Sequence, residues 1–105
     1  MLIYNTTFHV EDKLADDFLI YIKKMVVPRV VQLGLLMNPL LSKVLTEQEG
    51  QEGSCFALQF SVKNYDTFEY WFEKQGAALL QKLQADFKNR VLFFSTFLDE
   101  ISLDE

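Results

Sequence analysis

Alternation of apolar and polar side chains marks two segments of the chain as strands. Residues 2–10 and 54–62 change character at almost every step. A period of two is typical of a strand that buries one face. The buried faces are predicted to carry Leu2, Tyr4, Thr6, Phe8 and Val10 in the first segment and Phe56, Leu58, Phe60 and Val62 in the second. Further strands are predicted at 40–48 and at 90–98, and the latter has large apolar groups on both faces.

Helical spacing of apolar residues predicts a first helix that begins near Asp12. Pro28 either bends this helix or begins its last stretch, because proline lacks the backbone donor, and Gly34 is a natural stop. Asn38 and Pro39 then indicate a turn before the second strand. A glycine-punctuated segment at 47–53 is typical of a hairpin loop, so we expect the second and third strands to be antiparallel neighbours.

A second helix is predicted after the third strand. Asn64 can cap it, and its apolar stripe continues as far as Phe87. Gly76 lies in the middle of this stripe, where glycine costs about 1 kcal/mol relative to alanine. We therefore expect a kink or a close packing contact at Gly76.

The resulting order, β-α-β-β-α-β, predicts a ferredoxin-like α+β sandwich that forms a single domain over residues 1–105, with a tail at 99–105 that frays. Its sheet order is 4-1-3-2, all neighbours are antiparallel, and both helices lie on one face. The helix-free face then carries Asn5, Thr7 and His9 from the first strand and Gln59 and Ser61 from the third, beside apolar Ile3, Cys55 and Ala57.

Composition and charge limit the classes of partner that the chain is expected to bind. Half of the 105 residues are hydrophobic and the net charge is −5, with no run of Lys or Arg. An acidic chain without a basic patch repels phosphate backbones, which argues against nucleic acid. No apolar run approaches the roughly 20 residues of a membrane span, and no export signal is recognisable, so we expect no membrane partner and a cytoplasmic location.

Exposed apolar patches larger than a few hundred Å² are rare on monomeric proteins, so we expect this sheet face to be covered. The economical cover is a second copy packed sheet to sheet with twofold symmetry, which also protects the edge strands. Burial of about 600 Å² of apolar surface per subunit is worth about 15 kcal/mol before association costs are subtracted. We therefore predict a homodimer that forms through the helix-free face.

Three segments carry a family resemblance: "LIYNTTFHV", "VVPRVVQLGLL" and "SCFALQFSVKNYDTFEYWFEKQGAALL". The chain resembles, over residues 2–98, a family of small uncharacterised bacterial proteins of unknown function. That family is similar to the dimeric α+β barrel superfamily, whose relatives include cofactor-free monooxygenases, chlorite dismutase-like haem proteins and muconolactone isomerases. The resemblance implies a fold and a dimer, and it supplies no catalytic residues.

His9, the only histidine, is the candidate for catalysis. On the helix-free face it would join a polar patch whose predicted ligand-binding residues are Asn5, Thr7, Gln59 and Ser61. An imidazole in such a pocket can act as general base on a small aromatic or enolic substrate. The structural alternative is a half-solvated histidine at a strand end, with the polar patch serving as a hydrogen-bonded dimer seam.

Other chemistry has less support. Cys55 lacks a basic neighbour in the sequence, so a core cysteine is the better interpretation. One His and one Cys without ligand spacing predict no metal site, and we expect no cofactor, although a haem would require His9 as its axial ligand. RNA-recognition motifs share this strand order, but the stretch "EGSCFALQ" begins with an acid and lacks the expected aromatic at Ser54.

Two functional classes remain. In the first, the dimer encloses a small apolar or aromatic ligand, with monooxygenase-like or isomerase-like chemistry and His9 as the base if the protein is an enzyme. In the second, the protein is a non-enzymatic assembly or partner-binding module whose barrel is filled by its own side chains. Phe93, Phe94 and Phe97 favour the second class, and the polar patch favours the first.

Overall fold

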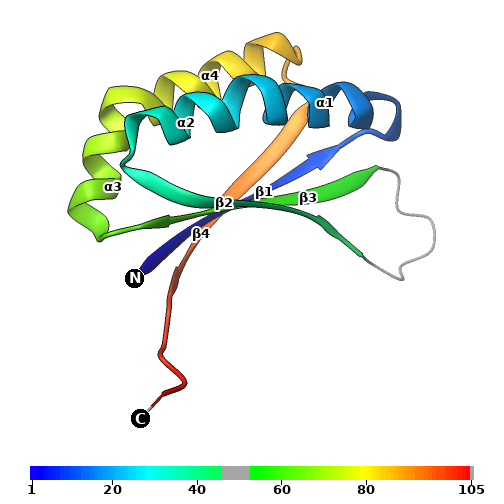
Figure 1. Ribbon diagram of the computed structural model, residues 1–105. Helices are drawn as coiled ribbons and strands as arrows, with labels where there is room; N and C mark the ends of the chain where they lie inside the picture. Colours follow the sequence, from blue (N-terminus) through cyan, green and yellow to red (C-terminus); the bar gives the residue numbers. More distant parts are fainter. Residues whose placement is uncertain (46–52, 105) are drawn as a thin grey trace.

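The computed structural model describes residues 1–45 and 53–104. Four strands form one sheet in the order β2-β3-β1-β4, with all neighbours antiparallel. The strands are β1 (Leu2–Val10), β2 (Leu36–Val44), β3 (Ser54–Val62) and β4 (Val91–Asp99). This is the predicted order 4-1-3-2 in reverse, and Figure 1 shows all helices on one side of the sheet. The ferredoxin-like sandwich is therefore confirmed.

The first helical run lies between β1 and β2. It consists of η1, a 3₁₀ turn (Asp12–Leu14), α1 (Ala15–Tyr21), η2, a π-helical segment (Ile22–Val26), and α2 (Val27–Leu33). Pro28 occupies the first turn of α2, directly after the π-helical segment, so it begins the last stretch as predicted. Gly34 ends the run with a left-handed φ of 75°, a conformation that glycine adopts without strain.

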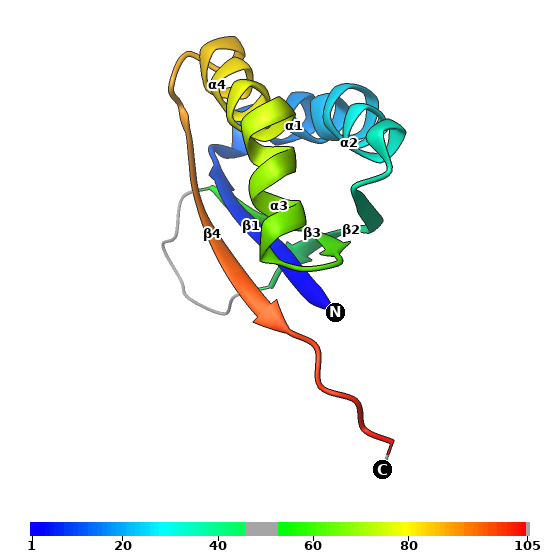
Figure 2. The ribbon, with the colours of Figure 1, turned by 90° about the vertical axis from the view of Figure 1, so that its left-hand side faces the viewer.

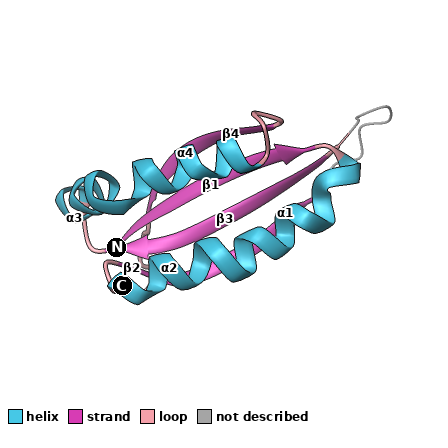
Figure 3. Cartoon of the chain, turned by 90° about the horizontal axis from the view of Figure 1, so that it is seen from above, coloured by secondary structure: helices cyan, strands magenta, loops and turns pink. Residues whose placement is uncertain are grey.

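The second run lies between β3 and β4 and is divided in the same way. It consists of α3 (Tyr65–Trp71), η3, a second π-helical segment (Phe72–Gly76), and α4 (Ala77–Asp86). Figure 3 shows the two runs side by side above the sheet. The Asn64 side chain caps α3 by accepting from the Thr67 N–H at 2.8 Å, and a Cβ on Gly76 would lie 2.5 Å from the Trp71 ring. The expected cap and close packing contact are both confirmed.

The prediction for β2 was wrong at its start. The strand begins at Leu36, and the pairing with β3 shifts register between Met37 and Leu40. Asn38 has a left-handed φ of 54°. Asn38 and Pro39 therefore form a bulge inside the strand instead of a turn before it, because Asn tolerates this conformation and Pro is accepted at an irregularity of an edge strand. Of the predicted 40–48 strand, Leu45 lies beyond the end of β2, and residues 46–48 fall outside the described residues.

The hydrophobic core lies between the sheet and the helices. Tyr4, Phe8, Phe56, Leu58 and Phe60 are all at most 5% exposed, as the alternation predicted. They pack with residues of the helical runs: Phe18, Ile22, Val26, Val30, Trp71, Leu79 and Leu83. The core thus occupies one side of the sheet and leaves the other side without a cover in the single chain.

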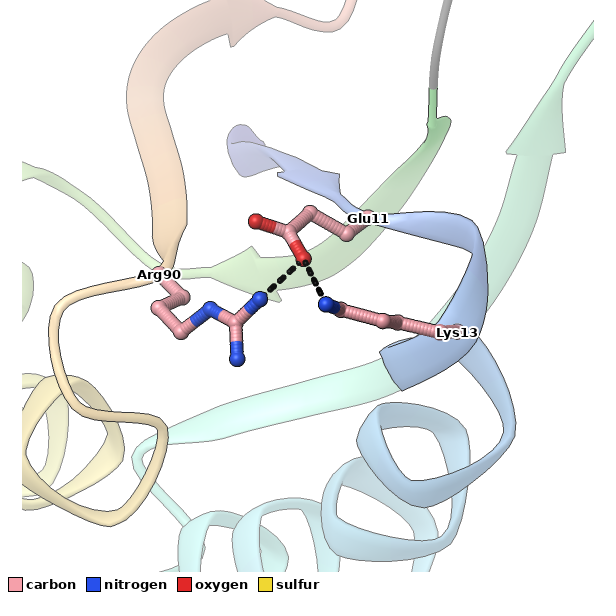
Figure 4. A network of polar contacts seen from close by, with 3 residues as sticks. All are labelled: Glu11, Lys13 and Arg90. Carbon is pink, nitrogen blue, oxygen red and sulfur yellow. Dashed lines mark hydrogen bonds and ion pairs between the residues drawn. The ribbon is translucent and has the colours of Figure 1, made fainter.

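Glu11, directly after β1, ties the start of β4 to the first helical run. Its carboxylate accepts from Arg90 and pairs with Lys13 at 3.7 Å (Figure 4). The contact is possible because β1 and β4 are antiparallel neighbours, so the end of one meets the start of the other. All three side chains are more than 40% exposed, and pairs of this kind contribute at most about 1 kcal/mol.

In the described part of the chain, no helix has the length and apolarity needed to cross a membrane.

Candidate functional site

The helix-free face of the sheet, called the open face below, is assembled from alternate residues of all four strands. The pairing registers align its members in rows across the strands in the order β2, β3, β1, β4. The rows are Met37, Ser61, Ile3, Leu98; Leu40, Gln59, Asn5, Thr96; Ser42, Ala57, Thr7, Phe94; and Val44, Cys55, His9, Leu92. All five predicted site residues therefore share this face: Asn5 and Gln59 occupy one row, and Ser61, Thr7 and His9 each occupy another.

The open face has apolar edges and a more polar centre. The edge strands contribute its large exposed hydrophobic side chains, among which Phe94 is 63% and Leu92 67% exposed, and Leu40 on the opposite edge is 55% exposed. The two central strands contribute mainly small or polar side chains that are half-buried. None of the positions in the four rows carries Asp, Glu, Lys or Arg, although 24% of the whole chain is charged. Solvated strand faces normally carry charges, so this composition is typical of a face that becomes covered.

Asn5 lies at the centre of the open face, between Gln59 on β3 and Thr96 on β4. Its Nδ2 donates to Oγ1 of Thr7 at 3.3 Å. Its Oδ1 is buried and has no hydrogen-bond partner among the described residues. A buried acceptor without a donor costs about 1–3 kcal/mol, so this oxygen is a natural anchor for a donor group from outside the chain.

His9 lies in the row at one end of the open face. Its Nδ1 is 3.4 Å from Sγ of Cys55, its direct neighbour on β3. The other side of the ring packs against Gly53, where a Cβ would lie 2.8 Å from Nε2, and Gly53 has a φ of 101°. The ring is therefore held between the end of β1 and the start of β3. A base beside a thiol is the arrangement that activates sulfur nucleophiles.

This contact corrects the interpretation of Cys55. The side chain is half-buried on the open face, where strand parity had placed it, and it lies against an imidazole and not in the core. Sequence reasoning missed the contact because the two residues are 46 positions apart and meet only through the register of β1 with β3. The lack of a basic neighbour in the sequence was therefore a poor guide to the surroundings of Cys55.

The fourth strand also requires a correction. Phe93 and Phe97 pair with Phe8 and Tyr4, so both point toward the helices and pack in the core. Only Phe94 points to the open face. The expectation that three Phe side chains fill the barrel was therefore wrong for two of them, and the centre of the open face is left with small side chains.

A family model described as domain of unknown function, DUF4286, matches residues 1–101. The chain belongs to the DUF4286 family. No curated protein matches its sequence. The family description assigns no activity.

Solved structures support the fold. HapK from Hahella chejuensis has a TM-score of 0.72 at 10% identity, covering 100% of this chain and 97% of that one. An uncharacterized NIPSNAP domain protein from Burkholderia xenovorans has a TM-score of 0.68 at 14% identity, covering 100% and 99%. A dimeric ferredoxin-like protein from an uncultured marine organism has a TM-score of 0.62 at 15% identity, covering 95% and 97%. At these identities the likeness establishes the shared fold alone.

The helix side of this DUF4286 sheet also contains hydroxyl groups whose contacts depend on the register of β1 with β4. The hydroxyl groups of Thr6 and Ser95 lie 3.1 Å apart, and Ser95 donates to the Tyr4 hydroxyl at 3.4 Å. Tyr4 and Thr6 border a cavity of about 30 Å³, which suffices for one water molecule and not for a substrate. Within residues 1–45 and 53–104, no three His, Cys, Asp or Glu side chains gather as a metal site would require.

Proposed function

We propose that this protein is a homodimer, packed open face to open face, that binds a small uncharged aromatic molecule between its two sheets. The observation that carries the proposal is the composition of the open face, which combines apolar edges, small polar side chains at its centre and no charged residue. Each part of this pattern has its own consequence for the assembly and the ligand.

The apolar edges favour a second copy of the chain as the cover. Side chains such as Leu40, Phe94 and Leu92 are more than half exposed in the single chain, and their burial supplies the driving force for association. Two solved proteins with a similar fold are described as dimeric ferredoxin-like proteins, with TM-scores of 0.62 and 0.64. The dimeric state of those proteins supports the same state here.

The centre of the open face favours a bound molecule over a fully packed interface. When the large edge side chains of two sheets meet, the shorter side chains at the centre, such as Thr7 and Ala57, leave space between the sheets. The unpaired Oδ1 of Asn5 needs a donor, which a hydroxyl or N–H group of the ligand would supply. A charged ligand would lose its hydration without a compensating charge on this face, so the ligand is uncharged.

His9 would act at one end of this space as the general base. Imidazole exchanges a proton near neutral pH, which suits abstraction from a phenol or an enol. Gln59 and Ser61 would complete the polar lining with Asn5 and Thr7. Cys55 would hold the His9 ring through the 3.4 Å contact.

The dimer is tested by analytical ultracentrifugation at micromolar concentration. We expect the wild-type chain to sediment as a dimer and Ala57→Lys to sediment as a monomer, because the substitution places a charge in the middle of the proposed interface. The matched control is Ala78→Lys on the exposed surface of α4, which should remain dimeric. A wild-type chain that sediments as a monomer would refute the proposal.

The ligand is tested with 1-naphthol as an uncharged aromatic probe with one hydroxyl donor, and with 1-naphthoate as its charged analogue. We expect 1-naphthol to raise the melting temperature of the dimer and 1-naphthoate to have little effect. Asn5→Leu should abolish the shift while the dimer persists. A dimer that responds to neither probe, and carries no small molecule in native mass spectrometry, would support the self-filled assembly instead.

A further inference from the structure

The segment after β4 extends away from the body of the molecule. Its first residue continues the sheet, because the backbone N–H of Glu100 donates to the carbonyl oxygen of Met1 at 3.0 Å. Beyond that point Ile101 is 79% and Leu103 is 99% exposed. Figures 1 and 2 show that this tail, residues 100–104, continues from the end of β4 and runs away from the helices.

The tail has the pattern of an extended segment with one apolar side. Ile101 and Leu103 are two residues apart, and Ser102 and Asp104 alternate with them. In an extended chain the two aliphatic side chains therefore point the same way. The structure has a bend at Leu103, with the Ser102 hydroxyl bonded to the Asp104 backbone, so docking as a strand would straighten the tail. Scattered exposed hydrophobic residues are ordinary, but two highly exposed aliphatic side chains two positions apart form a ready contact surface.

We propose that the tail of each protomer docks on strand β2 of a second copy of this chain, with Ile101 and Leu103 packed on the exposed apolar side chains of that strand. The inference rests on the proposed homodimer and adds a second contact to it. The tail leaves the sheet from the β4 edge, so the contact would be continuous with the interface between the open faces.

Charge selects β2 as the receiving strand. The tail and the end of β4 contain acidic residues, Asp99, Glu100 and Asp104, and no basic residue. The one charged residue of β4 is Asp99, which would repel an approaching tail, whereas the one charged residue of β2 is Lys43. Lys43 is exposed, and Leu40 and Val44 of the same strand are 55% and 40% exposed. Among the described residues, strand β2 is also an edge of the sheet, and a sheet edge can pair with an added strand.

The contribution of the tail to dimerisation is tested by measuring the dimer dissociation constant in sedimentation equilibrium. We expect the double variant Ile101→Ser, Leu103→Ser to weaken dimerisation at least tenfold, and Ser102→Ala, on the polar side of the tail, to leave the constant unchanged. Lys43→Glu should weaken dimerisation more at low salt than at high salt, because salt screens the attraction between Lys43 and the acidic tail. Equal constants for the wild-type chain and the double variant would overturn the inference.

The docking position of the tail on β2 is tested by disulfide trapping in a Cys55→Ser background, which removes the only native thiol. We expect Leu40→Cys combined with Leu103→Cys to give a covalent dimer on mild oxidation. The control pair, Ile20→Cys with Leu103→Cys, places the first thiol on an exposed position of α1 and should not cross-link. Cross-linking of the control pair as fast as the test pair would refute docking on β2.

The two proposals fail in different ways. A wild-type chain that is monomeric at micromolar concentration refutes the homodimer and the tail contact together. A wild-type dimer that is unaffected by the double variant and gives no Leu40→Cys, Leu103→Cys cross-link refutes the tail contact alone.

Discussion

The side chains of Tyr21 and Asp86 join the two helical runs. The Tyr21 hydroxyl, at the end of α1, donates to Oδ2 of Asp86, at the end of α4, at 2.7 Å. Lys82 donates to the same oxygen at 3.0 Å. Burial, followed by the hydrogen bond to Asp86, raises the pKa of Tyr21 to about 12. The hydrogen bonds from Tyr21 and Lys82 lower the pKa of Asp86.

This pair predicts a pH dependence at the alkaline end. The unfolded chain ionises tyrosine near pH 10, whereas folded Tyr21 keeps its proton until about pH 12. The stabilisation is therefore complete below pH 10 and is lost as the pH rises toward 12. Tyr21→Phe should flatten the stability profile over this window, as measured by urea unfolding at successive pH values. Tyr70→Phe, which removes an exposed tyrosine, should retain the wild-type slope. Identical slopes for the wild-type chain and Tyr21→Phe would contradict the argument.

Asn64 is predicted to contribute to stability through the cap of α3. Its side chain accepts from the Thr67 N–H at 2.8 Å, and loss of such a cap costs about 1 kcal/mol. Asn64→Ala should therefore lower the free energy of unfolding by about that amount in chemical denaturation. Asn64→Asp keeps an acceptor in place and should remain close to the wild-type value. A loss of similar size in both variants would mean that the cap is not the cause.

Gly76 is predicted to be intolerant of alanine despite its helical position. Alanine would gain about 1 kcal/mol in helix propensity, but its Cβ would lie 2.5 Å from Cζ3 of the buried Trp71 ring. Overpacking of this kind costs about 1–3 kcal/mol, so we expect Gly76→Ala to be destabilising overall. In a double-mutant cycle, Trp71→Phe should reduce the cost of Gly76→Ala, because the smaller ring leaves room. A stabilising Gly76→Ala would show that the Trp71 ring moves aside at little cost.

Much of the fold could be predicted because parity decides the face of a strand. Once β1 and β3 alternate, Tyr4 and Phe60 must point to one side and Asn5 and Gln59 to the other, whatever the neighbouring strands do. The placement of the five candidate residues on one face followed from this rule. The pairing of Asn5 with Gln59 is now given by the register.

Other features depended on information that the local sequence lacks. Phe93 and Phe94 are both large and apolar, so alternation does not assign β4 to a face, and only its register with β1 does. Asn38 and Pro39 have the residue types of a turn, but pairing with β3 keeps them inside β2 as a bulge. In both cases the partner strand, and not the local propensity, decides the conformation.

The contact between His9 and Cys55 predicts a reactive thiol. Nδ1 of His9 lies 3.4 Å from the sulfur and is placed to accept the thiol proton, and the thiolate is the species that reacts with alkylating agents. His9→Ala should therefore slow the alkylation of Cys55 by iodoacetamide at neutral pH by at least about threefold, as followed by mass spectrometry.

A change on the same face without contact to the thiol serves as the control. Thr96→Ala lies in the row of Asn5 and should leave the alkylation rate unchanged. Faster alkylation in His9→Ala would mean that the imidazole only shields the sulfur from the reagent. In that case His9 would have a packing role between β1 and Gly53, and the general base would have to be abandoned. A slower rate in His9→Ala alone would instead support proton transfer from Cys55 to the imidazole.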